Sequence, residues 1–167
     1  MTELVVLCDD AGNPTGTAPK ATVHTSDTPL HLAFSCWVFR GDDVLLTRRA
    51  LTKKTWPGVW TNTFCGHPGP GEATVDAVHR RAAFELGAQL SDVALALPDF
   101  RYRAVDSSGV VENEICPVYT AWLAGTIDPN PEEIDSYAWV PLDDVRRAVA
   151  ATPFAFSPWM VEELALL

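Results

Sequence analysis

The sequence lacks the features that mark a membrane-bound or secreted protein. No apolar run approaches the length of about 18 residues that a membrane-spanning helix needs. The N-terminus has neither the basic region nor the cleavage site of a signal peptide. The four cysteines are widely scattered without CxxC spacing, unlike the dense frameworks of small secreted domains. We therefore expect free thiols, a cytoplasmic protein and no membrane partner.

Basic residues are few, and they are unevenly distributed. The chain has 22 acidic residues, 12 lysines and arginines and a formal charge of -10, which argues against a nucleic-acid partner because phosphate neutralisation needs a basic face. Ten of the 12 basic residues lie between Lys20 and Arg103. Four of them form a group that can bind a small anion locally or make a solvated charged face, namely Arg48, Arg49, Lys53 and Lys54.

Length and patterning predict a single domain over residues 1–167. No internal repeat, low-complexity tract or linker divides the chain, and 47% hydrophobic residues suffice for a core and a deep pocket. Aliphatic, β-branched and alternating runs predict strands at 4–8, 30–40, 44–49, 61–65, 94–103, 110–124 and 137–140. Helices are expected at 74–86, 142–150 and near the C-terminus. This order of elements predicts an α/β (α+β) fold, a mixed β-sheet sandwiched between helices.

One segment has a clear helical pattern. Val75, Val78, Ala82 and Leu86 recur every three or four residues, so they would form the buried stripe of an amphipathic helix. Gly87 follows directly and can end the helix in a left-handed conformation.

Three histidines and two carboxylates have positions that suit a metal site. His24 and His31 lie in a loop that leads into a predicted strand, and His67 follows another predicted strand. Glu112 and Glu114 are separated by one residue, so both side chains face the same side of a strand. If these groups converge, they make a nitrogen and oxygen site that suits Mg²⁺, Mn²⁺ or Zn²⁺. Each histidine alone is more often a hydrogen-bonded structural residue, and the sequence does not prove convergence.

The stretch from residue 66 to residue 87 is similar to the Nudix box, a loop and helix that holds metal-bound diphosphates. The matching residues stand at the expected spacing, and they are Gly66, Glu72, Arg80, Glu85 and Gly87. Two positions depart from the box, because Arg81 and Phe84 stand where it carries glutamates. Hydrolases of this superfamily use that carboxylate cluster to gather metal ions and activate water. With Glu85 alone, we expect diphosphate binding rather than diphosphate hydrolysis.

Further motifs extend the resemblance over nearly the whole chain. They are Leu-His-Leu-Ala-Phe-Ser at 30–35, Thr-Asn-Thr-Phe-Cys-Gly-His-Pro at 61–68, Phe-Arg-Tyr-Arg at 100–103, Glu-Asn-Glu-Ile-Cys-Pro at 112–117 and Phe-Ser-Pro-Trp at 156–159. Together they closely resemble the type I isopentenyl-diphosphate delta-isomerases of the Nudix superfamily, and they are far more specific than the box alone. The resemblance implies a Nudix-like fold. It also implies isomerisation of isopentenyl diphosphate to dimethylallyl diphosphate through a tertiary carbocation, in isoprenoid biosynthesis.

The resemblance also implies two metal ions and a diphosphate site. One divalent metal, Mn²⁺, Mg²⁺ or Zn²⁺, would be held by His24, His31, His67, Glu112 and Glu114. A Mg²⁺ linked to the diphosphate would bind Glu85, with help from the backbone of Cys65. Four basic residues match positions that hold the diphosphate of a prenyl diphosphate substrate, and they are Lys20, Arg49, Lys53 and Arg81.

The same resemblance assigns the proton chemistry to Cys65 and Glu114, one on each face of a planar alkene. Trp159 would present a π-face to the cation, worth roughly 2 kcal/mol or more when desolvated, and Tyr102 would hydrogen-bond Glu114. Otherwise a free cysteine or a tryptophan is more often a packing residue. The alternatives are a Nudix diphosphate hydrolase and a non-catalytic prenyl-diphosphate binding protein. The sequence leaves open whether the chain is a monomer or a homodimer.

Overall fold

The computed structural model describes residues 2–167 and contains two mixed β-sheets. The seven strands of the larger sheet are β4 (Phe34–Arg40), β5 (Asp43–Arg49), β6 (Trp60–Thr61), β7 (Phe64–Gly66), β8 (Gln89–Leu97), β11 (Val118–Ala124) and β12 (Ile134–Pro141). Their order is β12-β5-β4-β11-β8, with β6 paired to β5 and β7 paired to β4. The five strands of the smaller sheet are β1 (Leu4–Cys8), β2 (Pro14–Pro19), β3 (His31–Leu32), β9 (Arg101–Val105) and β10 (Val111–Ile115). Their order is β2-β1-β3-β10-β9.

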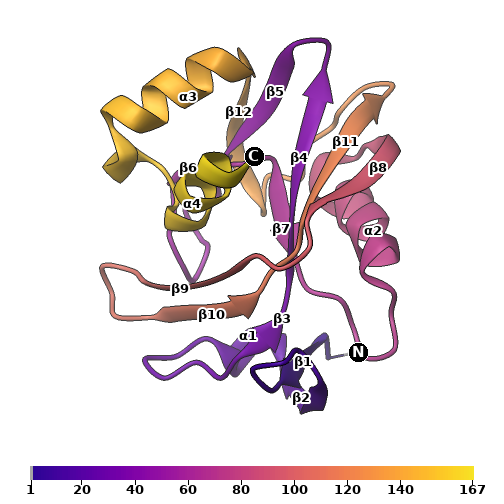
Figure 1. The fold of residues 1–167 in the computed structure, drawn as a ribbon, viewed down its shortest axis with the longest axis vertical. Helices are drawn as coiled ribbons and strands as arrows, with labels where there is room; N and C mark the ends of the chain where they lie inside the picture. The colour runs from indigo at the N-terminus through magenta and orange to yellow at the C-terminus, as the bar shows by residue number, and fades with distance from the viewer. Residues whose placement is uncertain (1) are drawn as a thin grey trace.

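Helices cover both faces of the larger sheet. The helical elements are α1 (Lys20–Val23), α2 (Thr74–Leu86), α3 (Leu142–Ala151), the 3-10 turn η1 (Pro153–Ala155) and α4 (Pro158–Leu166). Figure 1 shows α2 beside one face of the sheet and α3 and α4 beside the other. Alternate residues of β4 accordingly pack into two clusters, Trp37 with residues of α3 and α4, and Cys36 and Val38 with residues of α2. The predicted mixed sheet sandwiched between helices is confirmed, with a second sheet added to it.

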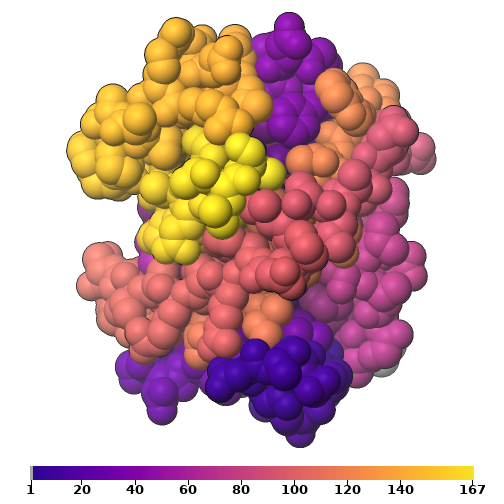
Figure 2. Space-filling model, in the orientation of Figure 1, coloured from indigo at the N-terminus to yellow at the C-terminus, as the bar shows by residue number. Residues whose placement is uncertain are grey.

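The C-terminal helix closes one side of the molecule. In the space-filling view α4 lies between α3 and the segment that contains β8 and β9 (Figure 2). Trp159, Met160 and Leu164 of α4 are buried in the core cluster that includes Trp37. No helix among residues 2–167 is long and apolar enough to cross a membrane.

Three segments that the sequence predicts as single strands each break in the middle. The segments 30–40, 94–103 and 110–124 divide into β3 and β4, β8 and β9, and β10 and β11. At each break the chain passes from one sheet to the other, and Pro98 and Pro117 mark two of the breaks because proline has no N–H to donate to a ladder. β3 pairs in parallel with β10, and β4 pairs in parallel with β11. The segments 31–40 and 111–124 therefore pass from the smaller sheet to the larger one side by side.

The remaining predictions differ from the structure in detail. The strand at 4–8 and the helix at 74–86 have the predicted bounds, whereas the expected strand at 61–65 is two short strands, β6 and β7. Sequence patterns did not predict β2 or α1, because the residues of β2 are turn formers and small polar residues that are mostly exposed.

The buried stripe of α2 differs from the predicted one at its N-terminal end. Val75 is 40% exposed, whereas the other three predicted members are buried, namely Val78, Ala82 and Leu86. Arg81 and Glu85 also belong to the buried face, although they are charged. Gly87 ends the helix with a left-handed φ of 58°, as expected.

Candidate active site

The register of the smaller sheet places Glu114 between two candidate residues. On β10, Glu114 is the direct cross-strand partner of His31 on β3 and of Tyr102 on β9. Directly opposed side chains on one face of a sheet lie close together. His31 Nε2 is accordingly 3.2 Å from Glu114 Oε1, and the Tyr102 hydroxyl donates a 3.0 Å hydrogen bond to Glu114 Oε2.

Two further imidazoles converge on the same carboxylate oxygen. His67 follows β7 and its Nε2 is 3.0 Å from Glu114 Oε1, while Nε2 of His24, directly after α1, is 3.7 Å from that atom. Ligand atoms of four residues, each within 4.8 Å of the others, form a cluster that can hold a metal ion, made of His24, His31, His67 and Glu114. Convergence of the three histidines, which the sequence alone does not prove, is therefore present in the structure.

Glu112 lies beside this cluster. Its Oε2 is 2.9 Å from Nε2 of His24, and its Oε1 accepts a 2.7 Å hydrogen bond from the Thr55 hydroxyl. Glu112 and Glu114 face the same side of β10, as their spacing predicts. Of the five residues expected at this metal, four share one group of mutually close atoms, and Glu112 contacts that group through His24.

Hydrogen bonding around the cluster leaves ligand atoms available. Nδ1 of His31 is 2.9 Å from the Pro29 carbonyl oxygen, which only accepts, so Nδ1 carries a proton, and in the neutral form that binds a metal Nε2 presents a lone pair. Nε2 of His24 and of His31 are buried 2.9 and 3.2 Å from carboxylate oxygens of Glu112 and Glu114, and when the imidazole rings carry no proton on Nε2 these contacts contain no donor. Buried acceptors that face one another are unfavourable unless a proton or a cation lies between them. This donor set fits a divalent metal.

The pKa values of the cluster reflect the same convergence. Burial raises the pKa of Glu114, but the charge and hydrogen bonds of the three histidines outweigh it and hold that pKa well below its usual range. Burial lowers the pKa of His24, yet hydrogen bonds and charge from Glu112 and Glu114 raise it to about 9. Burial lowers the pKa of His67 to about 4, with Glu114 only partly opposing. A metal bound here would displace the proton of His24.

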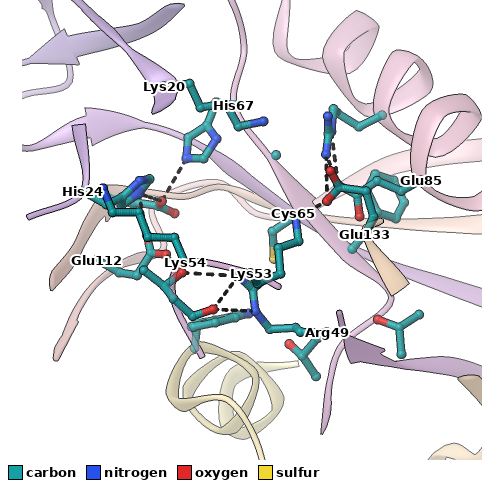
Figure 3. Close-up of a pocket in the computed structure, with 18 of the residues that line it drawn as sticks. Lys20, His24, Arg49, Lys53, Lys54, Cys65, His67, Glu85, Glu112 and Glu133 are labelled. Atoms are coloured by element: carbon teal, nitrogen blue, oxygen red, sulfur yellow. Dashed lines mark hydrogen bonds and ion pairs between the residues drawn. The ribbon is translucent and has the colours of Figure 1, made fainter. Parts of the chain in front are cut away.

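A cavity of about 610 Å³ opens beside the cluster. Every predicted site residue lines it except His31, which is completely buried. In Figure 3, Cys65 lies between His24 and Glu112 on one side and Glu85 and Glu133 on the other. Cys65 is on β7, and burial raises the pKa of its thiol well above the ordinary value. The thiol is therefore protonated at neutral pH in this structure.

Aromatic rings form one wall of the cavity. The Trp159 ring is 5.6 Å from the Tyr102 ring and 5.2 Å from the Trp56 ring, measured between centroids. The guanidinium carbon of Arg49 lies 5.4 Å from the Trp159 centroid, so this face already contacts a cation. The indole N–H of Trp159 donates a 3.2 Å hydrogen bond to Asn62 Oδ1, which fixes the orientation of the ring.

Cations and carboxylates share the part of the cavity next to α2. The four basic residues expected to hold the diphosphate all line the cavity, and they are Lys20, Arg49, Lys53 and Arg81. Arg81 donates to Glu85 and lies 3.5 Å from a carboxylate oxygen of Glu133, which also pairs with Lys53. A Cβ at Gly66 would lie 2.8 Å from the Cγ of Arg81, so the glycine between Cys65 and His67 gives Arg81 its place at the cavity.

Sequence reasoning missed several polar residues of the cavity wall, and Thr55 and Glu133 are the two that contact predicted site residues most directly. No sequence signal points to Glu133, because it lies far along the chain from Glu85 and reaches the cavity only through the fold. Thr55 follows the basic group at 53–54 without a spacing that would predict its hydrogen bond to Glu112. Thr55 holds one oxygen of the predicted metal ligand Glu112, and Glu133 offsets part of the positive charge of Lys53 and Arg81.

Two residues of the Nudix box act on its loop and do not line the cavity. Glu72 accepts hydrogen bonds from Nε of Arg80 and from the backbone N–H of Gly69, each 2.8 Å long. Arg80 also donates to the carbonyl oxygen of His67 at 3.1 Å. These bonds tie the loop to α2 and hold His67 beside the other two histidines and Glu114.

A buried acid on α4 gives a stability prediction. Burial raises the pKa of Glu163 to about 8 from an ordinary value of 4.5, so the folded protein binds a proton that the unfolded chain releases. Stability therefore falls as pH rises through this window. We expect Glu163→Gln to raise the free energy of unfolding by on the order of 4 kcal/mol at pH 8 and to have almost no effect on it at pH 4. Urea denaturation at both pH values, with the exposed Glu132→Gln as control, measures this, and a gain independent of pH would contradict it.

The fold, together with the loop and helix at residues 66–87 that match the Nudix box, defines a Nudix protein. A family model for the NUDIX domain matches residues 29–160. A solved structure from Deinococcus radiodurans covers 98% of both chains with a TM-score of 0.74 at 17% identity. A MutT NUDIX hydrolase from Burkholderia pseudomallei covers 83% of this chain and 98% of its own, with a TM-score of 0.64 at 22% identity. At such identities the likeness shows the fold alone.

Relatives by sequence are much more similar. The isopentenyl-diphosphate Delta-isomerase of Clavibacter sepedonicus is 63% identical over 99% of this chain and 88% of its own length. The protein of the same name from Citrobacter koseri is 54% identical over 95% of this chain and 88% of its own length. The chain belongs to the isopentenyl-diphosphate delta-isomerase family, which confirms the resemblance carried by its motifs.

Proposed function

We propose that this protein isomerises isopentenyl diphosphate to dimethylallyl diphosphate, a step of isoprenoid biosynthesis. The terminal alkene carbon gains a proton, which leaves a tertiary carbocation on the carbon beside it. The carbon on the other side of the cation then loses a proton, so the reaction consumes no oxidant, reductant or water. The observation that carries the proposal is one cavity lined by a thiol and a carboxylate, Cys65 and Glu114, together with aromatic rings and five basic residues. Membership of the isomerase family supports it.

The carboxylates and imidazoles would hold two metal ions. His24, His31, His67 and Glu114, with Glu112 beside them, would bind one divalent metal, for which Mn²⁺, Mg²⁺ and Zn²⁺ all accept this mixture of nitrogen and oxygen donors. Bound there, the metal would stabilise negative charge on the Glu114 carboxylate and so adjust its proton affinity. Glu85 would hold a Mg²⁺ that also binds the diphosphate, because Mg²⁺ prefers carboxylate and phosphate oxygens.

The cations of the cavity would bind the diphosphate end of the substrate. Lys53 and Arg81 pair with carboxylates in this structure, and we infer that they exchange Glu133 and Glu85 for phosphate oxygens when substrate binds. Lys20 and Arg49 would add two further charges from other elements. The hydrocarbon end would then lie toward the aromatic wall.

Proton transfer would take place between Cys65 and Glu114, one acting as acid and the other as base. Tyr102 holds Glu114 through the hydrogen bond to Oε2 and would assist the passage of its proton. The carbocation would face the ring of Trp159, a contact worth roughly 2 kcal/mol when desolvated. The buried aromatic wall would also exclude water, which would otherwise capture the cation.

Proton magnetic resonance of isopentenyl diphosphate in deuterated water, with purified enzyme and Mg²⁺, tests the function. We expect deuterium incorporation and dimethylallyl signals that disappear with a chelator. Release of phosphate from nucleoside diphosphates without this exchange would establish the rival Nudix hydrolase. Binding of isopentenyl diphosphate without exchange would establish a non-catalytic binding protein. The carboxylate-poor box disfavours the hydrolase, because Arg81 and Phe84 replace two of its glutamates.

Removing the charge of Arg81 will weaken substrate binding. We expect Arg81→Gln to raise KM for isopentenyl diphosphate about 10- to 100-fold with a smaller effect on kcat, because one charge-assisted contact to phosphate is lost. Steady-state kinetics measures the two parameters separately. Arg101→Gln, which removes an exposed arginine paired with Asp10 outside the cavity, is the matched control. An unchanged KM in the Arg81 variant would refute this role.

A further inference from the structure

A buried hydrogen-bond network lies behind Cys65, and the direction of its bonds follows from its donors. Oε2 of Glu163 is 2.7 Å from the indole nitrogen of Trp37 and 3.0 Å from the hydroxyl of Ser35. Both Glu163 and Ser35 are completely buried. Because an indole N–H only donates, Oε2 is the accepting oxygen of the carboxyl group. Ser35 therefore donates its single proton to Glu163.

Asn62 fixes the second bond of Ser35. Its Nδ2 is 2.7 Å from Ser35 Oγ and also lies 3.1 and 3.3 Å from the carbonyl oxygens of Cys36 and Phe64. Carbonyl oxygens only accept, so these contacts decide which end of the amide is the nitrogen. Asn62 consequently donates to Ser35. Its Oδ1 accepts from Trp159, so the same amide holds the aromatic wall.

With its proton donated to Glu163, Ser35 can only accept from Cys65, whose sulfur is 3.3 Å from Ser35 Oγ. We propose that Glu163 is a positioning residue for Cys65, which acts through Ser35 to hold the thiol at the cavity with its S–H bond directed at the serine oxygen. The proposal rests on the proposed function in so far as Cys65 is a reacting group there. The cross-strand pairing of Ser35 with Cys65 keeps this contact in register.

Glu163 performs this role as a neutral acid. It forms no ion pair among residues 2–167, and its Oε1 is buried without a partner, where the proton of a neutral carboxyl group would lie. The ionisable groups that interact with Glu163 are themselves acids. They are Cys36 on β4, Cys65 on β7, Glu114 on β10, Cys116 directly after β10, and Glu162 on α4. A glutamine has the shape of the neutral acid and keeps its accepting oxygen. Glu163→Gln is therefore a conservative variant, whereas Glu163→Met has a similar volume and accepts nothing.

The S–H stretching band of Cys65 in the Raman spectrum tests the network directly. It is isolated by subtracting the spectrum of the matched Cys65→Ala protein in each background. We expect Ser35→Ala to move the band to higher wavenumber, because the thiol is left with only the more distant Asn62 Oδ1, 3.7 Å from the sulfur. We expect Glu163→Met to move it in the same direction, because Ser35 loses the acceptor of its proton and no longer presents its oxygen to the thiol in one fixed orientation. Glu163→Gln should leave the band in place. In turnover we expect Glu163→Met to lower kcat by up to about 100-fold with KM within about twofold, and Glu163→Gln to retain kcat within about threefold.

Each outcome separates the alternatives. An unmoved band in both Glu163→Met and Ser35→Ala overturns the proposal, and so does a Glu163→Gln protein that matches Glu163→Met in band and kcat. Ser35→Ala keeps the test open if Glu163→Met does not fold. If the parent protein shows the expected band but no isomerisation, the proposed function fails while the network stands.

Discussion

Replacing Cys65 by serine will lower kcat for isopentenyl diphosphate by about 1,000-fold while the protein keeps its metal. A serine hydroxyl is a far weaker acid than a thiol, and its conjugate base is not available near neutral pH, so the proton-transfer role is lost. A loss of this size corresponds to about 4 kcal/mol of transition-state stabilisation, within the range of acid and base catalysis. The metal should stay because the cluster of close ligand atoms contains three histidines and a glutamate and no cysteine.

Two measurements on the same sample decide this prediction. Deuterium incorporation into isopentenyl diphosphate gives the rate, and equilibrium dialysis followed by elemental analysis gives the bound metal. Cys8→Ser is the matched control, because Cys8 is buried on β1 and does not line the cavity. A Cys65→Ser protein that turns over at the parent rate, or one that loses its metal, would contradict the assignment.

The elements that lie within one sheet or one helix follow from the sequence. Residues 74–86 have a helical period of apolar side chains and a glycine after them, and the structure has the same bounds. The three long strands were extended too far because their apolar character continues through the crossing between the sheets. A break of one to three residues does not interrupt such a pattern, and only the pairing of β3 with β10 and of β4 with β11 reveals two sheets.

The candidate site was only partly readable from residue patterns. The shared face of Glu112 and Glu114 follows from strand alternation, but their approach to His24 and His31 depends on pairing between segments more than 80 positions apart, for which the residue pattern gives no signal. The family resemblance supplied that information. Glu163 shows the remaining gap, because a glutamate in a short C-terminal helix normally lies in solvent, and only the packing of α4 against β4 makes it a buried hydrogen-bond acceptor.

Replacing Glu114 by glutamine will remove both the metal and the activity. Oε1 of Glu114 lies within 3.7 Å of the Nε2 atoms of all three histidines, and its other oxygen accepts from Tyr102. Glutamine lacks the negative charge that a divalent cation requires, and its amide can no longer accept at both positions. We expect metal affinity to fall at least about 100-fold, since even supporting partners of a metal ligand are worth about 10- to 100-fold. We expect kcat to fall by about 1,000-fold or more, because Glu114 also carries a proton in the proposed reaction.

The comparison with Glu112→Gln makes this prediction specific. Glu112 approaches the cluster through His24 and is not one of its four mutually close residues, so its variant should lose less metal affinity and should keep measurable turnover once saturated with metal. Glu114→Gln should stay inactive at any metal concentration, because excess metal restores occupancy but not the missing carboxyl group. Titration of each variant with Mn²⁺, followed by deuterium exchange at saturation, distinguishes the two. Recovery of the parent rate by Glu114→Gln at high metal would reduce Glu114 to a ligand and remove it from the proton chemistry.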